Sequence, residues 1–268
     1  MTSISDIAKK AGVAKSTVSR VINHHPHVSD ETRQKVMALI TELDYIPNQL
    51  ARDLSRGKTQ KIGVVIPHTR HPYFTQLING LLDAAKTTDY QLVMMPSDYN
   101  KELELSYLKQ LKMEAIDALI FTSRAISLDI IETYAKYGRI VVCEKLQEYN
   151  HLSSAYLDRY SSFLEAFSDM KLRGLEHLVL LFSRNNESSA TYQSAFDEVA
   201  AGLIKGYEES RKKRPYIIGQ ECLLVGQLLK LPTIDHKSYY LGKLAFKQAL
   251  AEKISQEVLF SEFLSQDN

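Results

Sequence analysis

One short stretch near the N-terminus puts small polar and basic side chains at the start of a predicted helix. Residues 15–17 read Lys-Ser-Thr, and Ser19 and Arg20 follow about one turn later. Such side chains can reach base edges in a DNA groove, while hydroxyl and backbone N–H groups hold phosphate oxygens. For an isolated Lys15 or Arg20 a solvated surface charge is the simpler interpretation, but the surrounding pattern favours a recognition helix.

The spacing of other chemically active residues does not indicate an enzyme. His24, His25 and His27 have no metal-ligand spacing with a cysteine or an acid, so we interpret them as loop residues. The sequence contains no phosphate loop or nucleophile elbow, and His177 and Ser183 do not have the spacing of a catalytic triad. We therefore expect no catalytic residue, no metal site and no cofactor.

Three short helices are predicted to position the polar stretch. Ser3 and Asp6 form a capping-box pattern at the start of the first helix. Gly12 can adopt the positive φ of a tight turn, and residues 14–22 are expected to form the second helix. Ser29 can cap a third helix that ends near residue 43. Because such a unit encloses very little core, we expect it to depend on a partner or on DNA.

Charge is distributed unevenly along the chain. The net charge of all 268 residues is only +1, but the first 61 residues contain ten basic and six acidic residues. This leaves about +4 in that segment and about −3 in the remainder. A basic N-terminal segment is expected where one end of a protein meets phosphates.

Beyond residue 61, short apolar runs alternate with longer amphipathic stretches. The predicted strands are 62–66, 91–95, 118–121 and 140–143, and the predicted helices are 74–87, 101–113 and 128–137. Strand, helix, strand in this order predicts a parallel sheet. A second α/β lobe is predicted from helix 159–172, strand 178–182, helix 199–212, strand 216–219 and helix 239–252.

The chain is thus expected to have an all-α helix-turn-helix headpiece over residues 1–47, a hinge and linker over 48–61, and a two-lobed α/β body over 62–268. No apolar run reaches the roughly 18 residues of a membrane span, and the first twenty residues lack the pattern of a secretory signal. Cys143 and Cys222 lie in apolar strings, which favours inert core thiols. We therefore expect a cytoplasmic protein.

Three motifs in the N-terminal segment together resemble one known family. They read DIAKKAGVAKSTVSRVIN at residues 6–23, VSDETRQKV at 28–36 and LDYIPNQLARDL at 43–54. On these motifs the segment resembles the lactose-repressor (LacI/GalR-type) family of bacterial transcription regulators, and the resemblance covers the headpiece and the hinge. It implies a DNA-binding regulator that meets double-stranded operator DNA as a homodimer.

The resemblance also implies roles for individual residues. The positions expected to read bases are Lys15, Ser16 and Arg20, and those expected at phosphates are Thr17, Ser19 and Asn23. The positions that match the family's hinge helix are Asn48, Ala51 and Leu54. A leucine wedge in the minor groove can unstack a base step and bend the duplex. Leu54 could instead be a core residue, but its neighbours are polar, which favours the minor-groove role.

The body resembles periplasmic sugar-binding proteins. The resemblance is carried by IGVVIP at 62–67, HPYF at 71–74, IDALI at 116–120, DEVAAG at 197–202 and PTID at 232–235. It implies a small sugar-like effector. Tyr73 or Phe74 would stack on this effector, while Arg184 and Asp197 would hydrogen-bond its hydroxyl groups. The alternative, an ordinary core aromatic or surface charge at each position, is equally compatible with the sequence alone.

The body departs from the family pattern near residues 195–196. Residues 184–195 are followed at once by Phe196 and Asp197, where the family normally has a helix, a strand, another helix and a further strand. The second lobe is therefore expected to be shortened by an internal deletion, which would expose apolar helix faces and unpaired strand edges.

Two functions remain open at this point. The first is a repressor of carbohydrate-metabolism genes whose ligand, a sugar or sugar phosphate, alters the fit of two headpieces to two half-sites. The second is a DNA-binding dimer whose shortened body no longer binds an effector. An enzyme is a third and weaker interpretation, because no catalytic motif supports it.

Overall fold

The structure is a computed structural model, and it describes residues 3–23, 25–46, 53, 56–147, 151–174, 216–220 and 230–265. The chain divides into two compact units, Met1–Lys58 and Thr59–Asn268. The first contains the expected headpiece and the second the expected body. The predicted strand 178–182 and helix 199–212 lie outside the described residues.

The three predicted headpiece helices are α1 (Ile4–Ala11), α2 (Lys15–Ile22) and α3 (Asp30–Glu42). Ser3 and Asp6 form a reciprocal capping box at the start of α1. The Ser3 backbone N–H donates to the Asp6 carboxylate at 2.9 Å, and the Asp6 N–H donates to the Ser3 hydroxyl at 3.3 Å. Hydrogen bonds from Ser3 therefore lower the pKa of Asp6.

A small apolar core holds the three helices together. Its buried members come from all three helices and are Ile7, Ala8, Ala11, Val18, Val21 and Val36. Between α1 and α2, Gly12 has a φ of +69°, and its backbone N–H donates to carbonyl oxygens of the last turn of α1. The turn therefore needs the backbone freedom of glycine, as the sequence predicts.

The body is built on a six-stranded sheet with strand order β2-β1-β3-β4-β5-β8, and neighbouring strands in it are parallel. Its strands are β1 (Lys61–Ile66), β2 (Gln91–Pro96), β3 (Ala118–Phe121), β4 (Arg139–Val142), β5 (Ser153–Asp158) and β8 (Gln256–Phe260). The first four were predicted from their apolar runs. A buried parallel sheet needs helices on both faces.

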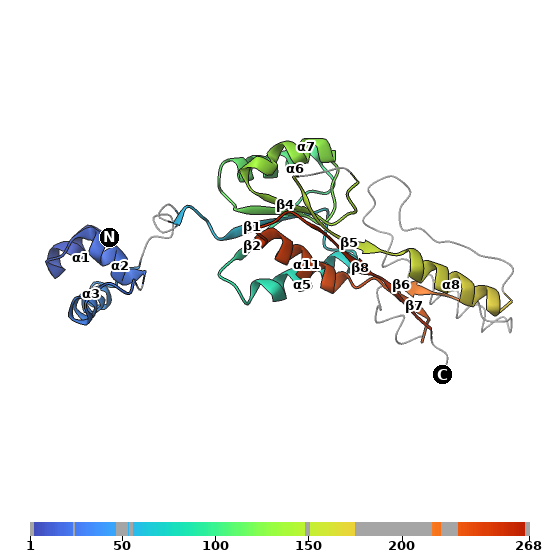
Figure 1. Ribbon diagram of the computed structural model, residues 1–268, viewed down its shortest axis with the longest axis horizontal. Helices are drawn as coiled ribbons and strands as arrows, with labels where there is room; N and C mark the ends of the chain where they lie inside the picture. Colours follow the sequence, from blue (N-terminus) through green and yellow to red (C-terminus); the bar gives the residue numbers. More distant parts are fainter. Residues whose placement is uncertain are drawn as a thin grey trace. The chain divides into compact units, whose positions relative to one another are not determined.

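Helices cover both faces of this sheet (Figure 1). One face carries α5 (Pro72–Ala85) and α11 (Ser238–Leu250), and the other carries α6 (Lys101–Lys112), α7 (Leu128–Tyr134) and the short 3₁₀ turn η1 (Ala135–Tyr137). Each face has its own apolar core cluster. The result is a three-layer α/β sandwich whose strand ends are free to form a site.

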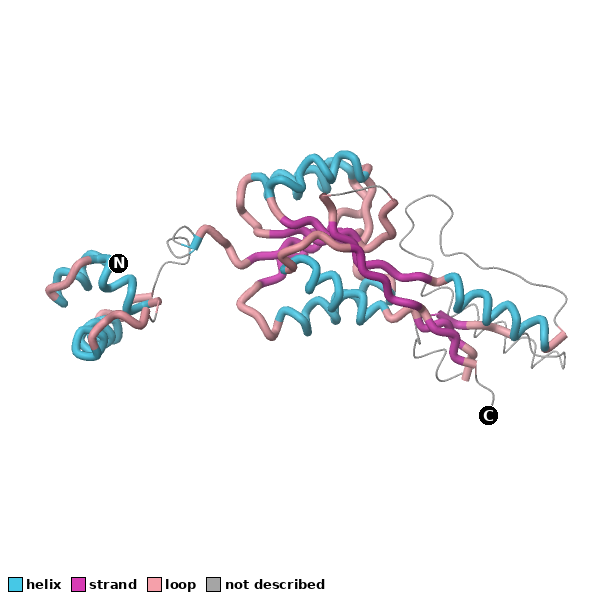
Figure 2. Tube along the Cα trace, viewed as in Figure 1, coloured by secondary structure: helices cyan, strands magenta, loops and turns pink. Residues whose placement is uncertain are grey.

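The described part of the second lobe contains α8 (Tyr160–Leu172), β6 (Gly219–Gln220), β7 (Thr233–Asp235) and β9 (Glu262–Leu264). Figure 2 shows that β5 and β8 carry the chain from the first sheet into this lobe. The pairing β6–β7 is parallel, as expected for an α/β lobe, whereas the added pairing β7–β9 is antiparallel. The chain order explains the antiparallel pairing. Strand β9 directly follows β8 and runs away from the first lobe, whereas β7 runs toward the first lobe, where the chain continues as α11.

The sequence placed helix 239–252 in the second lobe, and this was wrong. The corresponding helix, α11, packs against α5 on the first sheet. Strands β5, β7, β8 and β9 were not predicted, and the strand expected at 216–219 is reduced to β6. Among the described helices, none is long and apolar enough to cross a membrane.

Candidate nucleic-acid interface and candidate ligand site

Helix α2 has one buried side and one polar side. Val18 and Val21 are fully buried against α1 and α3. The opposite side carries the residues that the sequence assigned to DNA. Among them Lys15, Ser16, Arg20 and Asn23 are exposed, whereas Thr17 and Ser19 are half-buried. The burial of the two valines thus turns the polar residues outward.

Two of these polar residues are joined along the helix. The side-chain amide of Asn23 donates to the Ser19 hydroxyl at 3.4 Å, one turn earlier. This bond limits the side-chain freedom of both groups before any partner arrives. Both groups keep further hydrogen-bonding capacity, which suits contacts to phosphate oxygens.

The N-terminus of α2 differs from the other two in the headpiece. Helix α1 is capped by Ser3 and α3 by Ser29, and both have acidic residues in the first turn. Helix α2 begins after Ala14, with no side-chain cap and no acid in its first turn. Within the described residues, the positive end of its dipole is therefore not compensated by an acid or a capping side chain, an arrangement that favours a phosphate.

The basic side chains of α2 have no acidic partner among the residues that the structure describes. The ion pair in the described headpiece joins Lys10 to Glu42 at 3.6 Å, both exposed. Lys15 and Arg20 form none with a described residue, so their charge remains available for an anion. The hinge positions Asn48, Ala51 and Leu54 lie outside the described residues.

In the body, a cavity of about 380 Å³ lies at the carboxyl ends of β4 and β5, beside the start of α5. Its lining residues are Tyr73, Cys143, Glu144, Lys145, Tyr156, Leu157, Asp158 and Arg159. In open parallel sheets this edge is where ligands gather. Two acids, two bases and two tyrosines give the cavity the polar and aromatic character that hydroxyl-rich ligands need.

The two aromatic candidates for ligand stacking differ in position. Tyr73 lines the cavity, and the Arg159 guanidinium lies 6.0 Å from the centre of its ring. Phe74 is only 2% exposed and packs edge-on against His68, His71 and Tyr73. Of the two alternatives the geometry favours Tyr73, with Phe74 as a core residue. Arg184 and Asp197 lie outside the described residues.

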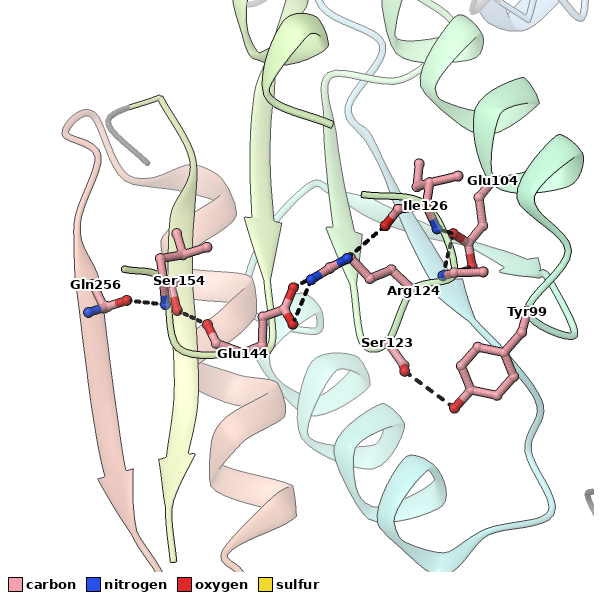
Figure 3. Close-up of polar contacts among 10 residues, drawn as sticks. Tyr99, Glu104, Ser123, Arg124, Ile126, Glu144, Ser154 and Gln256 are labelled. Carbon is pink, nitrogen blue, oxygen red and sulfur yellow. Dashed lines mark hydrogen bonds and ion pairs between the residues drawn. The ribbon is translucent and has the colours of Figure 1, made fainter. Parts of the chain in front are cut away.

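An ion pair fixes one acidic group of the cavity wall (Figure 3). Arg124 follows β3 and Glu144 follows β4, and Nε and Nη2 of Arg124 donate to the two carboxylate oxygens of Glu144. Nη1 of Arg124 donates to the carbonyl oxygen of Ile126 at 2.7 Å. The carboxylate is therefore both oriented and charge-compensated where it meets the cavity.

A buried carboxylate on α6 holds the loop that carries Arg124. Glu104 is 0% exposed, and it accepts hydrogen bonds from the backbone N–H groups of Ala125 and Ile126 at 2.8 and 3.0 Å. The Ser97 hydroxyl donates to the same carboxylate at 3.1 Å. Since its oxygens are satisfied, Glu104 can remain buried and keep the loop in one conformation.

The thiol of Cys143, which lines the cavity, is expected to be unreactive. Cys143 follows β4, and burial raises the pKa of its thiol to about 12. The thiol is therefore protonated at neutral pH, as expected for a core cysteine. Cys222 lies outside the described residues, and the described part of the chain contains no cluster of His, Cys, Asp and Glu that could hold a metal ion.

Sequence reasoning missed most of the cavity. Of its lining residues only Tyr73 had been named as a ligand-binding candidate. The others directly follow or end β4 and β5, so the rule that ligands gather at carboxyl ends of strands could have found Glu144 and Lys145 after the predicted strand 140–143. Asp158 and Arg159 needed β5, which was not predicted.

Comparison with known proteins decides the family. Residues 3–48 match the bacterial regulatory proteins of the lacI family, and residues 59–211 match the periplasmic binding proteins and sugar binding domain of the LacI family. The second match alone covers more than half of the chain. This chain belongs to the LacI family. The LacI resemblance inferred from the headpiece motifs is thereby confirmed.

Relatives in the LacI family are similar over much of this chain. Catabolite control protein B of Bacillus subtilis (strain 168) is 41% identical over 201 residues, which cover 75% of this chain and 63% of that protein. The NTD biosynthesis operon regulator NtdR of the same organism is 38% identical over 179 residues, covering 67% and 52%. The chain therefore spans between half and two thirds of the length of these relatives.

A further LacI relative is matched over more of its length. The ribose operon repressor of Halalkalibacterium halodurans is 28% identical over 289 positions, which cover 90% of this chain and 87% of that protein. Because this match is longer than the 268 residues of the chain, the relative contains residues without a counterpart here.

Solved structures show the same fold. The Lac repressor dimer bound to operator and the anti-inducer ONPF has a TM-score of 0.79 at 20% identity and covers 98% of both chains. A LacI-family regulator CCPA from Weissella paramesenteroides with bound glucose has a TM-score of 0.61 at 15% identity and covers 77% of this chain and 97% of its own. At these identities the likeness establishes the LacI fold and nothing finer.

Proposed function

We propose that this chain is a sequence-specific DNA-binding transcription repressor whose helix α2 reads operator bases. The observation that carries the proposal is the polar face of α2, where exposed Lys15 and Arg20 have no described acidic partner and the helix N-terminus has no cap. A helix N-terminus of this kind can anchor on phosphate while its first side chains reach base edges. The names of two relatives, an operon regulator and an operon repressor, support it.

The six polar residues of the α2 region then divide between two tasks. Lys15, Ser16 and Arg20 read base edges, because they are exposed and can donate to the guanine and adenine acceptors of the major groove. Thr17, Ser19 and Asn23 contact phosphates, and the Ser19–Asn23 hydrogen bond orients two of them. Contacts to phosphate set the register in which bases are read.

The hinge and the dimer complete the DNA-binding proposal. Headpiece 1–47 is followed by hinge and linker 48–61, in which Asn48, Ala51 and Leu54 form a helix on the operator and Leu54 enters the minor groove. A homodimer presents two headpieces to two half-sites. The area in contact with DNA is then twice that of one small headpiece.

The body, residues 62–268, is proposed to bind a sugar or sugar phosphate in the cavity beside Tyr73. The tyrosine ring can cover C–H surface. Glu144 and Asp158 can accept hydrogen bonds from ligand hydroxyl groups, whereas Lys145 and Arg159 can donate to hydroxyl or phosphate oxygens. Arg184 and Asp197 are proposed to hydrogen-bond the hydroxyl groups of this ligand. We place the shortening of this lobe near residues 195–196, and the longer match to the ribose operon repressor supports a deletion.

We further propose that the chain acts in the cytoplasm and has no enzymatic activity of its own. Its family is a regulatory one, and the sequence shows no catalytic motif. The regulated genes are proposed to serve carbohydrate metabolism, in line with the relatives named as catabolite control proteins and a ribose operon repressor.

Selection of bound fragments from a random duplex pool tests the DNA-binding proposal. The full chain should enrich a palindromic site with two half-sites, because a symmetric dimer carries two recognition helices. A pool that shows no enriched sequence after repeated rounds would exclude sequence-specific binding.

Calorimetry against a panel of sugars and sugar phosphates tests the ligand proposal separately. Binding with a negative heat-capacity change supports an effector site, since apolar surface is buried on the aromatic wall. If no compound of a broad panel binds, the alternative is favoured, in which the shortened body only holds the dimer together.

A further inference from the structure

The chain enters the body at Thr59 and Gln60, and one carboxylate holds both residues. The backbone N–H and the hydroxyl of Thr59 donate to Oδ1 of Asp117 at 2.8 and 2.9 Å, and the N–H of Gln60 donates to Oδ2 at 2.9 Å. Asp117 is half-buried and directly precedes β3. A single side chain thus binds three donors from the end of the linker.

Backbone hydrogen bonds at the starts of β3 and β2 also hold the end of the linker. The N–H of Asp117 donates to the carbonyl oxygen of Lys61, and the N–H of Gln91 donates to that of Gln60, both at 2.8 Å. Gln60 has a φ of +55°, a left-handed conformation that is unfavourable for a residue with a side chain. The hydrogen bonds around it are what maintain this conformation.

The position of Asp117 links this clamp to the cavity edge of the sheet. Strand β3 is four residues long, and the loop at its far end carries Arg124, which holds Glu144 at the cavity wall. One short central strand therefore has the linker clamp at its amino end and the cavity wall at its carboxyl end. The last residue assigned to the other compact unit is Lys58, directly before the clamp.

We propose that Asp117 is a positioning residue for DNA binding, which fixes the linker to the body and so sets the affinity for the operator. The inference rests on the proposed function. A carboxylate that accepts three bonds defines where and in what direction the chain leaves the body, which reduces the freedom of the linker that has to order on DNA. When the clamp is loosened, ordering the linker on each half-site costs more conformational entropy, and the affinity for the operator falls.

The substitution Asp117→Asn tests the clamp with little change in volume. The amide keeps one oxygen but turns an NH₂ group toward one of the N–H donors, so at least one bond becomes a donor–donor contact. Thr59→Val is the graded variant, because it leaves both backbone donors to Asp117 and removes the two bonds of the hydroxyl, the one it donates to Asp117 and the one it accepts from the Lys61 N–H. Asp89→Asn is the matched control, because Asp89 is an exposed carboxylate in the turn before β2.

Two readouts on the full chain decide the matter. In limited trypsin digestion without DNA, the first cut between Arg56 and Lys61 should be several-fold faster in Asp117→Asn, slightly faster in Thr59→Val and unchanged in Asp89→Asn. Affinity for the duplex selected from the random pool should fall about tenfold in Asp117→Asn and less in Thr59→Val. Thermal unfolding of the body serves to show that each variant is folded.

The outcomes separate this inference from the proposed function. If the wild-type chain selects no duplex, the proposed function fails, while the trypsin readout still reports on the clamp. If wild type binds its duplex and Asp117→Asn matches it in both affinity and linker cleavage, the clamp is overturned. If Asp117→Asn does not fold, Thr59→Val decides, and wild-type behaviour of that variant in both readouts overturns the inference.

Discussion

Gly80 on α5 and Gly242 on α11 each lie against the backbone of the opposite helix. A Cβ atom on Gly80 would be 1.9 Å from the carbonyl oxygen of Tyr239, and one on Gly242 would be 2.0 Å from that of Leu77. The two helices, about 160 residues apart in the chain, therefore approach as closely as backbone allows. This contact lets α11 pack closely against α5, while Leu241, Ala245 and Phe246 join the apolar core of the first sheet.

We predict that Gly242→Ala destabilises the body by at least about 2 kcal/mol, although alanine is the better helix former. The methyl group would overlap backbone that cannot move aside without separating α5 from α11. Urea unfolding measures the change. Lys247→Ala on the exposed face of α11 should stay within about 0.5 kcal/mol of wild type, and an equal effect of both substitutions would contradict the close approach.

A second prediction concerns the buried carboxylate of Glu104. In Glu104→Gln an NH₂ group would face backbone N–H groups of the 125–126 loop, so the free energy of unfolding should fall by about 2–3 kcal/mol. Glu102→Gln, on the exposed side of the same helix, should cost under about 1 kcal/mol, the size of a helix-dipole interaction. Chemical denaturation compares the two, and equal stabilities would show that Glu104 does not hold the loop.

The stability of the body is predicted to depend on pH through His236. Burial, with a smaller contribution from the Arg159 charge, lowers the pKa of His236 from 6.5 to about 4. Between these values the unfolded chain binds a proton that the folded chain does not, so stability falls as pH drops from 6.5 toward 4, by up to about 3 kcal/mol.

The measurement is the free energy of unfolding of wild type and His236→Asn at pH 7 and at pH 5. The wild-type loss between the two should exceed that of the variant. Parallel pH curves for the two proteins would rule out His236 as the source of this dependence.

The ligand site gives a fourth prediction. Tyr73→Leu should weaken binding of the sugar found by calorimetry about tenfold, because the stacking surface is lost. Phe74→Leu should instead lower stability, since Phe74 is a core residue. Tyr137→Leu, which precedes β4 at the opposite edge of the sheet, is the control for the loss of a tyrosine. A larger affinity loss in Phe74→Leu than in Tyr73→Leu would reverse the assignment.

The elements that were predictable from sequence are those fixed by local signals. The Ser3–Asp6 box, Gly12 and Ser29 set the headpiece helices because capping and turn chemistry act within a few residues. The apolar runs of β1 to β4 are similarly local. Helix-turn-helix spacing likewise predicts that Lys15 and Arg20 are exposed on α2, and both are.

The elements that were missed depend on distant partners. Strand β5 begins with Ser153 and Ser154, which are polar by type but fully buried between β4 and β8. Its partner β8 lies about a hundred residues further along the chain. Without β5, the cavity residues Asp158 and Arg159 could not be grouped with Glu144.

The central claim is that α2 discriminates between base pairs, and Arg20 tests it most directly. The measurement is the ratio of affinities for the selected duplex and a scrambled duplex at physiological salt, for wild type, Arg20→Ala and Lys35→Ala. Lys35 is an exposed base on α3, so both variants lose one positive charge.

We predict that Arg20→Ala lowers binding to the selected duplex by about 1–3 kcal/mol more than binding to the scrambled one, whereas Lys35→Ala weakens both equally and leaves the ratio unchanged. A wild-type protein that holds scrambled DNA as tightly as its selected site, or a ratio that Arg20→Ala leaves untouched, would contradict the assignment of α2 as the base-reading helix.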